Sequence, residues 1–181
     1  MMQEPAASKV RRSWTVADWL TVLRLPLAVA FPLVHDMGGR TLILALAAGS
    51  DLADGAIARR VGSSRFGVFL DPVVDKLFMA SAFGTVLFSG ELHVYEILAV
   101  LARDIVAAGA FLLTLARKRP ASIPARAGGK AVTVAQSLTL LAFVFDSPLL
   151  RPLAWATAAM ALYALADYGR LAVQYAQKNR E

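Results

Sequence analysis

Four aspartates lie at helical spacing inside two hydrophobic stretches of this chain. Asp51 and Asp54 form one pair, and Asp71 and Asp75 form the other. An ionised carboxylate is costly to hold among apolar side chains unless a partner neutralises it or a function requires it. Carboxylate oxygens are the ligands that suit a hard divalent cation such as Mg²⁺ or Mn²⁺. The spacing therefore predicts that the four carboxylates converge on a metal ion from two helices.

Small residues and an arginine accompany the first aspartate pair. On a helix that turns about 100° per residue, one arc of about 140° holds Asp51, Asp54, Gly55, Ala58 and Arg59. Gly67 shares a face with Asp71 and Asp75 in the same way on the next helix. The glycine and alanine let a ligand approach the backbone closely, and an arginine that keeps its proton suits a phosphate. Together these residues predict a metal-assisted phosphate site.

This pattern resembles the signature of the CDP-alcohol phosphatidyltransferases. The matching residues follow the order Asp51-x-x-Asp54-Gly55-x-x-Ala58-Arg59 and then Gly67-x-x-x-Asp71-x-x-x-Asp75. The segment between Arg59 and Gly67 is about one residue shorter than is usual in the family, a change that a solvent-facing turn tolerates. The resemblance implies a donor linked to CDP, typically CDP-diacylglycerol. It also implies one or two Mg²⁺ or Mn²⁺ ions, with two expected in such a site, and a homodimer.

The resemblance also assigns a role to each signature residue. Metal binding falls to Asp51, Asp54, Asp71 and Asp75. Binding of the CDP donor falls to Asp54, Gly55, Ala58, Arg59 and Gly67. Asp75 would act as the general base for an acceptor hydroxyl, which attacks the lipid-side phosphorus while CMP leaves.

The composition of the chain predicts an integral membrane protein. Its 181 residues are 57% hydrophobic, and its mean hydropathy of +0.56 is far above that of a soluble domain. The length accommodates about six spans of ~20 residues. We therefore expect an all-α bundle of transmembrane helices with a cytoplasm-facing polar cavity. Residues 1–181 would form a single domain, with a polar segment at 1–13 and the bundle at 14–174.

The apolar runs place the six spans. They run over about 14–34, 41–59, 66–88, 94–117, 131–145 and 150–168. Outer turns are expected at 35–40 and 89–93, which contain His35 and His93, and Glu96 is expected near the outer interface. An inner loop at 121–130 would contain Gly129 and Lys130. The absence of cysteine excludes disulfides and thiolate metal sites.

The basic residues predict the orientation of these spans. The chain has 19 Lys+Arg against 13 Asp+Glu, a balance that in a soluble protein would suggest nucleic acid as a partner. Most of these cations instead fall on one side of the six-span arrangement, and only Arg40 and Arg151 lie in turns on the other. By the positive-inside rule we expect a multi-pass inner-membrane protein with both termini and the cavity mouth at the cytoplasmic side. No nucleic-acid partner is expected.

A second group of polar residues could bind an acceptor. The segment Gly129-Lys130-x-x-Thr133-x-x-Gln136 resembles one in phosphatidylglycerophosphate synthases, although Val132 replaces a second lysine. This resemblance implies an acceptor-phosphate site made of Arg103, Arg126, Lys130 and Thr133. The alternatives are an ordinary basic loop for Lys130 and an interhelical ion pair for the Arg103-Asp104 segment. Arg24 could either snorkel to the inner surface or contact a lipid phosphate.

Four hypotheses for the function remain. The first is transfer of a phosphatidyl group from CDP-diacylglycerol to sn-glycerol 3-phosphate, in the manner of bacterial phosphatidylglycerophosphate synthase. The second uses another acceptor of the family, namely phosphatidylglycerol, serine or inositol phosphate. The third, from a different class, is a cation transporter with an aspartate-lined pathway, which would leave Gly55, Ala58, Arg59 and Gly67 unexplained. A non-catalytic relative of the family is a further alternative.

Overall fold

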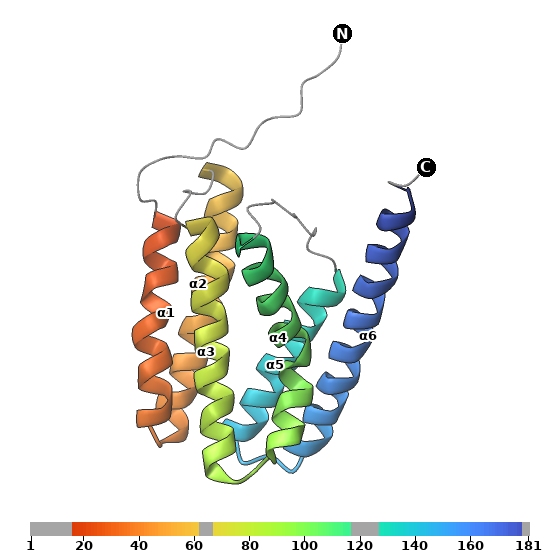
Figure 1. Ribbon diagram of the computed structural model, residues 1–181. Helices are drawn as coiled ribbons and strands as arrows, with labels where there is room; N and C mark the ends of the chain where they lie inside the picture. Colours follow the sequence, from red (N-terminus) through yellow and green to blue (C-terminus); the bar gives the residue numbers. More distant parts are fainter. Residues whose placement is uncertain (1–15, 62–66, 117–126, 179–181) are drawn as a thin grey trace. The chain divides into compact units, whose positions relative to one another are not determined.

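The computed structural model describes the backbone of residues 16–61, 67–116 and 127–178. Within these ranges it leaves undescribed the side chains of residues 16–17, 54–61, 67–69, 72, 111, 114–116, 127–128, 168 and 171–178. The described chain forms six helices and no strand, as Figure 1 shows. They are α1 (Val16–Leu33), α2 (Met37–Val61), α3 (Gly67–Ser89), α4 (Val94–Ala116), α5 (Ala127–Val144) and α6 (Leu150–Lys178). The all-helical prediction is confirmed over this part of the chain.

Three predicted helix boundaries were wrong. Because α5 begins at Ala127, Gly129 and Lys130 are helical and do not lie in a loop. The last helix, α6, continues to Lys178 and does not end near residue 168. The turn before α2 is shorter than expected, because Asp36 caps the helix by accepting a bond of 2.6 Å from the N–H of Gly39. An apolar run identifies the middle of a helix. The helix can extend beyond that run, because the backbone groups of polar residues form the same helical hydrogen bonds.

The chain divides into two compact units, Met1–Thr85 and Val86–Glu181. In the first unit α1 packs along α2. In the second unit α6 packs against both α4 and α5 (Figure 1). The division falls inside α3, so the predicted signature residues of α2 and α3 all belong to the first unit.

Contacts between α1 and α3 follow from a proline in α1. Pro32 has no N–H, so the carbonyl of Ala28 loses its partner within the helix. Ser81 of α3 donates a hydrogen bond of 2.5 Å from its Oγ to that carbonyl. Next to it, Phe31 is fully buried and packs edge-on against Phe78 at a centroid distance of 6.2 Å. These contacts fix the position of α3 along α1.

Small and hydroxylated residues join the helices of the second unit. Ala154, Ala158 and Ala161 form a buried stripe on α6, and such small side chains let neighbouring helices approach closely. Thr139 of α5 and Thr157 of α6 share a buried hydrogen bond of 3.0 Å. Because the two buried hydroxyls bond to each other, their hydrogen-bonding needs are met between the helices, and the bond fixes the register of α5 and α6.

The turn from α5 to α6 depends on Asp146. Its N–H donates to the carbonyl of Phe143 and the N–H of Ser147 donates to that of Ala142, at 3.2 and 2.9 Å. This is a Schellman motif, which places Asp146 in the left-handed region with a φ of 46°. Aspartate and asparagine tolerate that conformation better than other residues that carry a Cβ.

We therefore expect Asp146→Val to lower the stability of the protein. A β-branched residue in the left-handed region costs about 1–2 kcal/mol, and the loss should appear as a lower midpoint of thermal unfolding in detergent. Asp146→Asn is the matched control and should unfold near the wild-type midpoint. Equal midpoints for the two variants would contradict this account of the turn.

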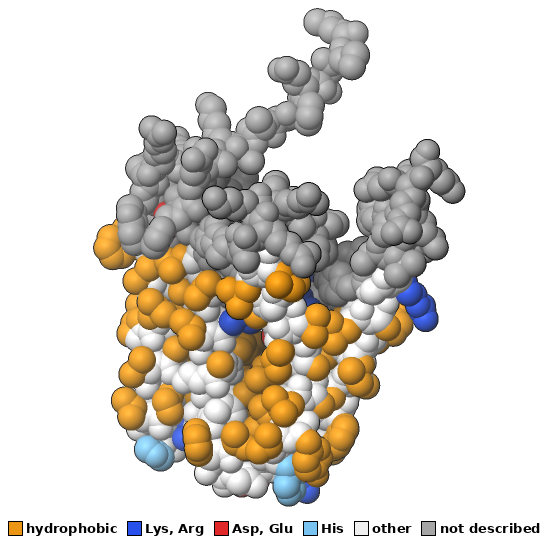
Figure 2. Space-filling view, viewed as in Figure 1, with side chains coloured by type: hydrophobic (Ala, Val, Ile, Leu, Met, Phe, Trp, Pro, Cys, Tyr) orange, Lys and Arg blue, Asp and Glu red, His pale blue; other side chains and the backbone are white. Residues whose placement is uncertain are grey.

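Large apolar side chains are exposed on all six described helices. Among them, Phe88 is 90% exposed, and Leu52 and Tyr163 are each 74% exposed. Figure 2 shows such side chains over much of the described surface that faces the viewer. Exposed apolar surface of this extent indicates contact with other apolar material. None of the helices, over the residues described, has the combined length and apolar content that crossing a membrane requires.

Candidate functional site

One face of α1 carries buried polar residues at every third position. They are Asp18, Thr21 and Arg24, each at most 2% exposed, and we call them the polar face of α1. The same side of the helix continues into Ala28 and Phe31, which pack against α3. Buried polar groups are costly unless they find partners. The partners of Thr21 and Arg24 include two of the signature aspartates.

Arg24 of the polar face contacts the first aspartate of the signature. Its Nη2 lies 3.4 Å from Oδ1 of Asp51, and its Nε donates to Oγ of Ser50 at 3.0 Å. Ser50 in turn donates to the carbonyl of Ala47 at 2.8 Å. The two expected roles of Arg24, snorkelling and a lipid-phosphate contact, did not include this ion pair. A buried guanidinium needs a counter-charge, and α2 supplies it.

The second aspartate pair lies one helical turn apart on α3. Thr21 donates a hydrogen bond from Oγ1 to Oδ1 of Asp71. Asp75 is about one third exposed, and its Oδ2 lies 3.6 Å from Nζ of Lys76. The lysine partly balances the negative charge of Asp75. The polar face of α1 therefore contacts one aspartate of α2 and one of α3.

Part of the predicted site lies outside the described side chains. This applies to Asp54, Gly55, Ala58 and Arg59, whose backbone is in α2, and to Gly67, the first residue of α3. Among the side chains that are described, no group of three or more His, Cys, Asp or Glu could hold a metal ion. The donor set itself consists of carboxylate oxygens, which fits Mg²⁺ or Mn²⁺. Convergence of all four aspartates stays a prediction.

A second polar cluster joins α4 and α5. Nη1 of Arg103 lies 3.4 Å from Oδ1 of Asp104, and Gln136 donates from Nε2 to Oδ2 of Asp104 at 2.5 Å. Gln136 also donates to the carbonyl of Val100 at 3.1 Å. The interhelical ion pair considered for Arg103 was wrong in one respect, because its acid partner lies on the same helix. The link between the helices comes from Gln136, whose side chain is buried.

Arg103 has unused hydrogen-bonding capacity. Its Nε is buried and has no hydrogen-bond partner among the described residues, and such an orphan donor is a candidate ligand-binding group. Thr133 lies one turn from Gln136 on α5 and donates to the carbonyl of Gly129 at 3.3 Å. Lys130, one turn further, is exposed. Arg126 lies outside the described residues, so three of the four predicted acceptor-binding residues can be placed.

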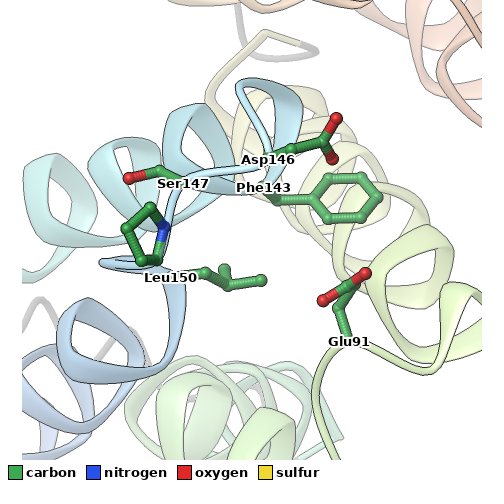
Figure 3. Close-up of a pocket in the computed structure, with 6 residues that line it drawn as sticks. Glu91, Phe143, Asp146, Ser147 and Leu150 are labelled. Atoms are coloured by element: carbon green, nitrogen blue, oxygen red, sulfur yellow. The ribbon is translucent and has the colours of Figure 1, made fainter.

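A separate group of charges lies where α4 begins. The buried carboxylate of Glu96 accepts a bond of 2.8 Å from the N–H of His93, and Arg151 of α6 approaches it at 3.4 Å. Nearby, a cavity of about 250 Å³ is lined by Glu91, Phe143, Asp146, Ser147, Pro148 and Leu150. Figure 3 shows Phe143 and Leu150 extending toward Glu91. Glu96 lies beside the turn at 89–93, and its contacts are those of a helix cap. Its place near the outer interface stays a prediction.

Comparison with known proteins decides the family. The sequence model of the CDP-alcohol phosphatidyltransferases matches residues 14–166, which include every signature residue. The chain belongs to the CDP-alcohol phosphatidyltransferase family. This confirms the resemblance seen in the aspartate signature.

Three relatives of this chain carry different names. A Mycobacterium bovis protein named "Putative cardiolipin synthase" is 38% identical over 135 residues, covering 72% of this chain and 64% of that protein. A Mycobacterium tuberculosis protein named "Probable phosphatidylglycerophosphate synthase" is 34% identical over 148 residues, covering 76% of this chain and 68% of that protein. A Sodalis glossinidius protein named "CDP-diacylglycerol--glycerol-3-phosphate 3-phosphatidyltransferase" is 32% identical over 147 residues, covering 72% of this chain and 76% of that protein.

Sequence reasoning missed the contacts that α1 makes with the signature aspartates. Of the three residues of the polar face, only Arg24 was given possible roles from the sequence. The signal that could have found them is a polar residue at every third position of an otherwise apolar helix, because such residues share one face. The spacing alone does not say which helix that face contacts.

Proposed function

We propose that this chain transfers a phosphatidyl group from CDP-diacylglycerol to an alcohol and releases CMP. Membership of the family supports the reaction class. The observation that carries the proposal for this site is that Asp51 of α2 and Asp71 of α3 both contact the buried polar face of α1. Carboxylates held in this way are suited to a fixed role at a site, whereas solvated charges on a helix surface turn freely.

The signature residues have distinct roles in this reaction. Asp51, Asp54, Asp71 and Asp75 supply the oxygen ligands for one or two Mg²⁺ or Mn²⁺ ions, which when bound neutralise the donor's pyrophosphate. Arg59 would contact the phosphates, while Gly55, Ala58 and Gly67 would leave space for the cytidine. Asp75 accepts the proton of the acceptor hydroxyl as its oxygen attacks the lipid-side phosphorus. The bond from that phosphorus to CMP then breaks.

We propose sn-glycerol 3-phosphate as the acceptor. Arg103, Arg126, Lys130 and Thr133 would bind its phosphate. The buried Nε of Arg103 supports this because it has no hydrogen-bond partner among the described residues. Phosphatidylglycerol is the second candidate, since a relative that is 38% identical bears the name of a cardiolipin synthase. Serine and inositol phosphate are the remaining acceptors of the family to be tested.

The proposal includes a place for the protein in the cell. We infer a multi-pass inner-membrane bundle with both termini cytoplasmic, surrounded by membrane lipids and acting as a homodimer. The hydrophobic share of 57% and the exposed apolar side chains on every described helix support the membrane setting. The basic residues support the orientation, since most are expected on one side of the six-span arrangement.

An acceptor panel tests this function. Purified protein receives CDP-diacylglycerol and Mg²⁺ with glycerol 3-phosphate, phosphatidylglycerol, serine or inositol phosphate, and CMP release is measured. We expect acceptor-dependent CMP release, greatest with glycerol 3-phosphate. The same protein in sealed vesicles should show no cation flux without nucleotide. Flux without any CMP release would favour the transporter hypothesis and contradict the proposal.

Lys130→Ala should weaken binding of a phosphorylated acceptor. Loss of one charge-assisted contact is expected to raise the KM for glycerol 3-phosphate about tenfold, equivalent to about 1.4 kcal/mol, while the KM for CDP-diacylglycerol stays unchanged. Lys130→Arg should restore most of the affinity. Arg170→Ala, which removes another exposed cation of the same unit, is the control. An unchanged acceptor KM in Lys130→Ala would remove Lys130 from the acceptor site.

A further inference from the structure

We infer that Thr21 and Arg24 are positioning residues that orient the carboxylates of Asp71 and Asp51 toward their ligand. This inference rests on the proposed function, because it concerns how the proposed metal ligands are held. Thr21 donates to Oδ1 of Asp71, and Arg24 lies 3.4 Å from Oδ1 of Asp51. One helix thus contacts one aspartate from each half of the signature.

Packing makes α1 a rigid base for this role. Thr21 is 0% and Arg24 is 2% exposed, so neither side chain can swing into solvent. The two residues lie one turn apart and face the same side of α1. Further along the same helix, Ser81 of α3 is bonded to the carbonyl of Ala28. The position of α3 along α1 is therefore held independently of Thr21.

Each contact restricts the rotation of a carboxylate. A free aspartate side chain samples several rotamers, and a ligand site must hold its groups within about 0.5 Å of their working positions. When a hydroxyl or a guanidinium holds one oxygen of a carboxylate, the direction in which its second oxygen points is also fixed. Partners of this kind around a metal ligand are worth about 10–100-fold in metal affinity.

Arg24 adds a charge effect to this orientation. Neighbouring carboxylates repel one another, and a buried guanidinium beside Asp51 offsets part of that repulsion. The planar group contacts Ser50 and Asp51 together, which an ammonium group cannot do with the same geometry. Arg24→Lys should therefore keep the charge and lose part of the orientation.

Mn²⁺ binding to the purified full-length protein in detergent tests the inference without any turnover. Free Mn²⁺ is measured by electron paramagnetic resonance during titration. Thr21→Val is compared with Ser81→Ala, since each removes one hydrogen bond between α1 and α3. We expect Thr21→Val to weaken Mn²⁺ binding about tenfold, with Thr21→Ser and Ser81→Ala within about twofold of the wild type. Arg24→Lys should fall between the wild type and Thr21→Val.

A double-mutant cycle shows whether Thr21 acts through Asp71. In an Asp71→Asn background, Thr21→Val should cause no further loss of Mn²⁺ affinity. The inference would be overturned if Thr21→Val and Ser81→Ala weakened Mn²⁺ binding equally. It would also be overturned if the losses of Mn²⁺ affinity caused by Thr21→Val and Asp71→Asn simply added in the double variant. Either result would leave the proposed metal site in place. If the wild-type protein itself binds no Mn²⁺, both the inference and the metal part of the proposed function fail.

Discussion

Replacing Asp75 by asparagine is expected to reduce phosphatidyl transfer by at least about 10³-fold. A general base contributes about 10²–10⁴-fold to such a reaction, and the variant also loses a charged ligand. An amide cannot accept the proton of the acceptor hydroxyl. Asp75 is partly exposed on α3 with Lys76 beside it, so the substitution changes the charge of an accessible group and leaves the core intact. CMP release from CDP-diacylglycerol in the presence of Mg²⁺ measures the effect.

Asp146→Asn provides the matched control for this experiment. It makes the same chemical change at an exposed aspartate in the turn between α5 and α6, and its turnover should equal that of the wild type. The thermal midpoint of Asp75→Asn should lie close to the wild-type value, which separates loss of chemistry from loss of fold. Wild-type turnover in a folded Asp75→Asn protein would contradict the assignment of the base.

Removal of divalent cations is expected to abolish CMP release, and addition of Mg²⁺ is expected to restore it. Four converging carboxylates and a pyrophosphate would repel one another, because unit charges 4 Å apart interact by about 4 kcal/mol at the effective dielectric constant of 20 that applies near a protein surface. The donor should therefore bind weakly without cations. Activity is measured in excess chelator and again after Mg²⁺ has been added beyond the chelator concentration.

A chelator that has first been saturated with Mg²⁺ is the control for direct effects of the chelator on the protein. Activity with this reagent should match activity without it. Full activity in excess free chelator would show that the aspartates work without a divalent cation. The acid signature would then need another explanation, such as protonated carboxyl groups that donate hydrogen bonds.

Much of the helical fold could be predicted because apolar runs of about 20 residues dominate this chain. The ends of helices were less predictable. The α2 start depends on the cap at Asp36, and α5 extends through Gly129 and Lys130 although glycine is a poor helix former. Such boundaries depend on local hydrogen bonds and packing, which hydropathy does not report.

The candidate site was predictable where the sequence motif is local. The order of the aspartates placed them on two successive helices, and the structure confirms that Asp51 lies in α2 and that Asp71 and Asp75 lie in α3. Contacts between distant segments could not be predicted. The bond from Thr21 to Asp71 joins residues 50 positions apart, and its existence depends on how α1 packs against its neighbours.

The central claim is that the signature aspartates hold a metal ion and that this ion binds the donor's phosphates. The most direct test measures whether the bound metal ion contacts those phosphates. Mn²⁺-loaded protein is mixed with CDP-diacylglycerol, and pulsed electron paramagnetic resonance is used to detect ³¹P hyperfine coupling to the bound Mn²⁺. We predict a coupling typical of directly bound phosphate oxygens in the wild type and its loss in an Asp51→Asn, Asp71→Asn double variant. Bound Mn²⁺ without ³¹P coupling in the wild-type protein would contradict the account.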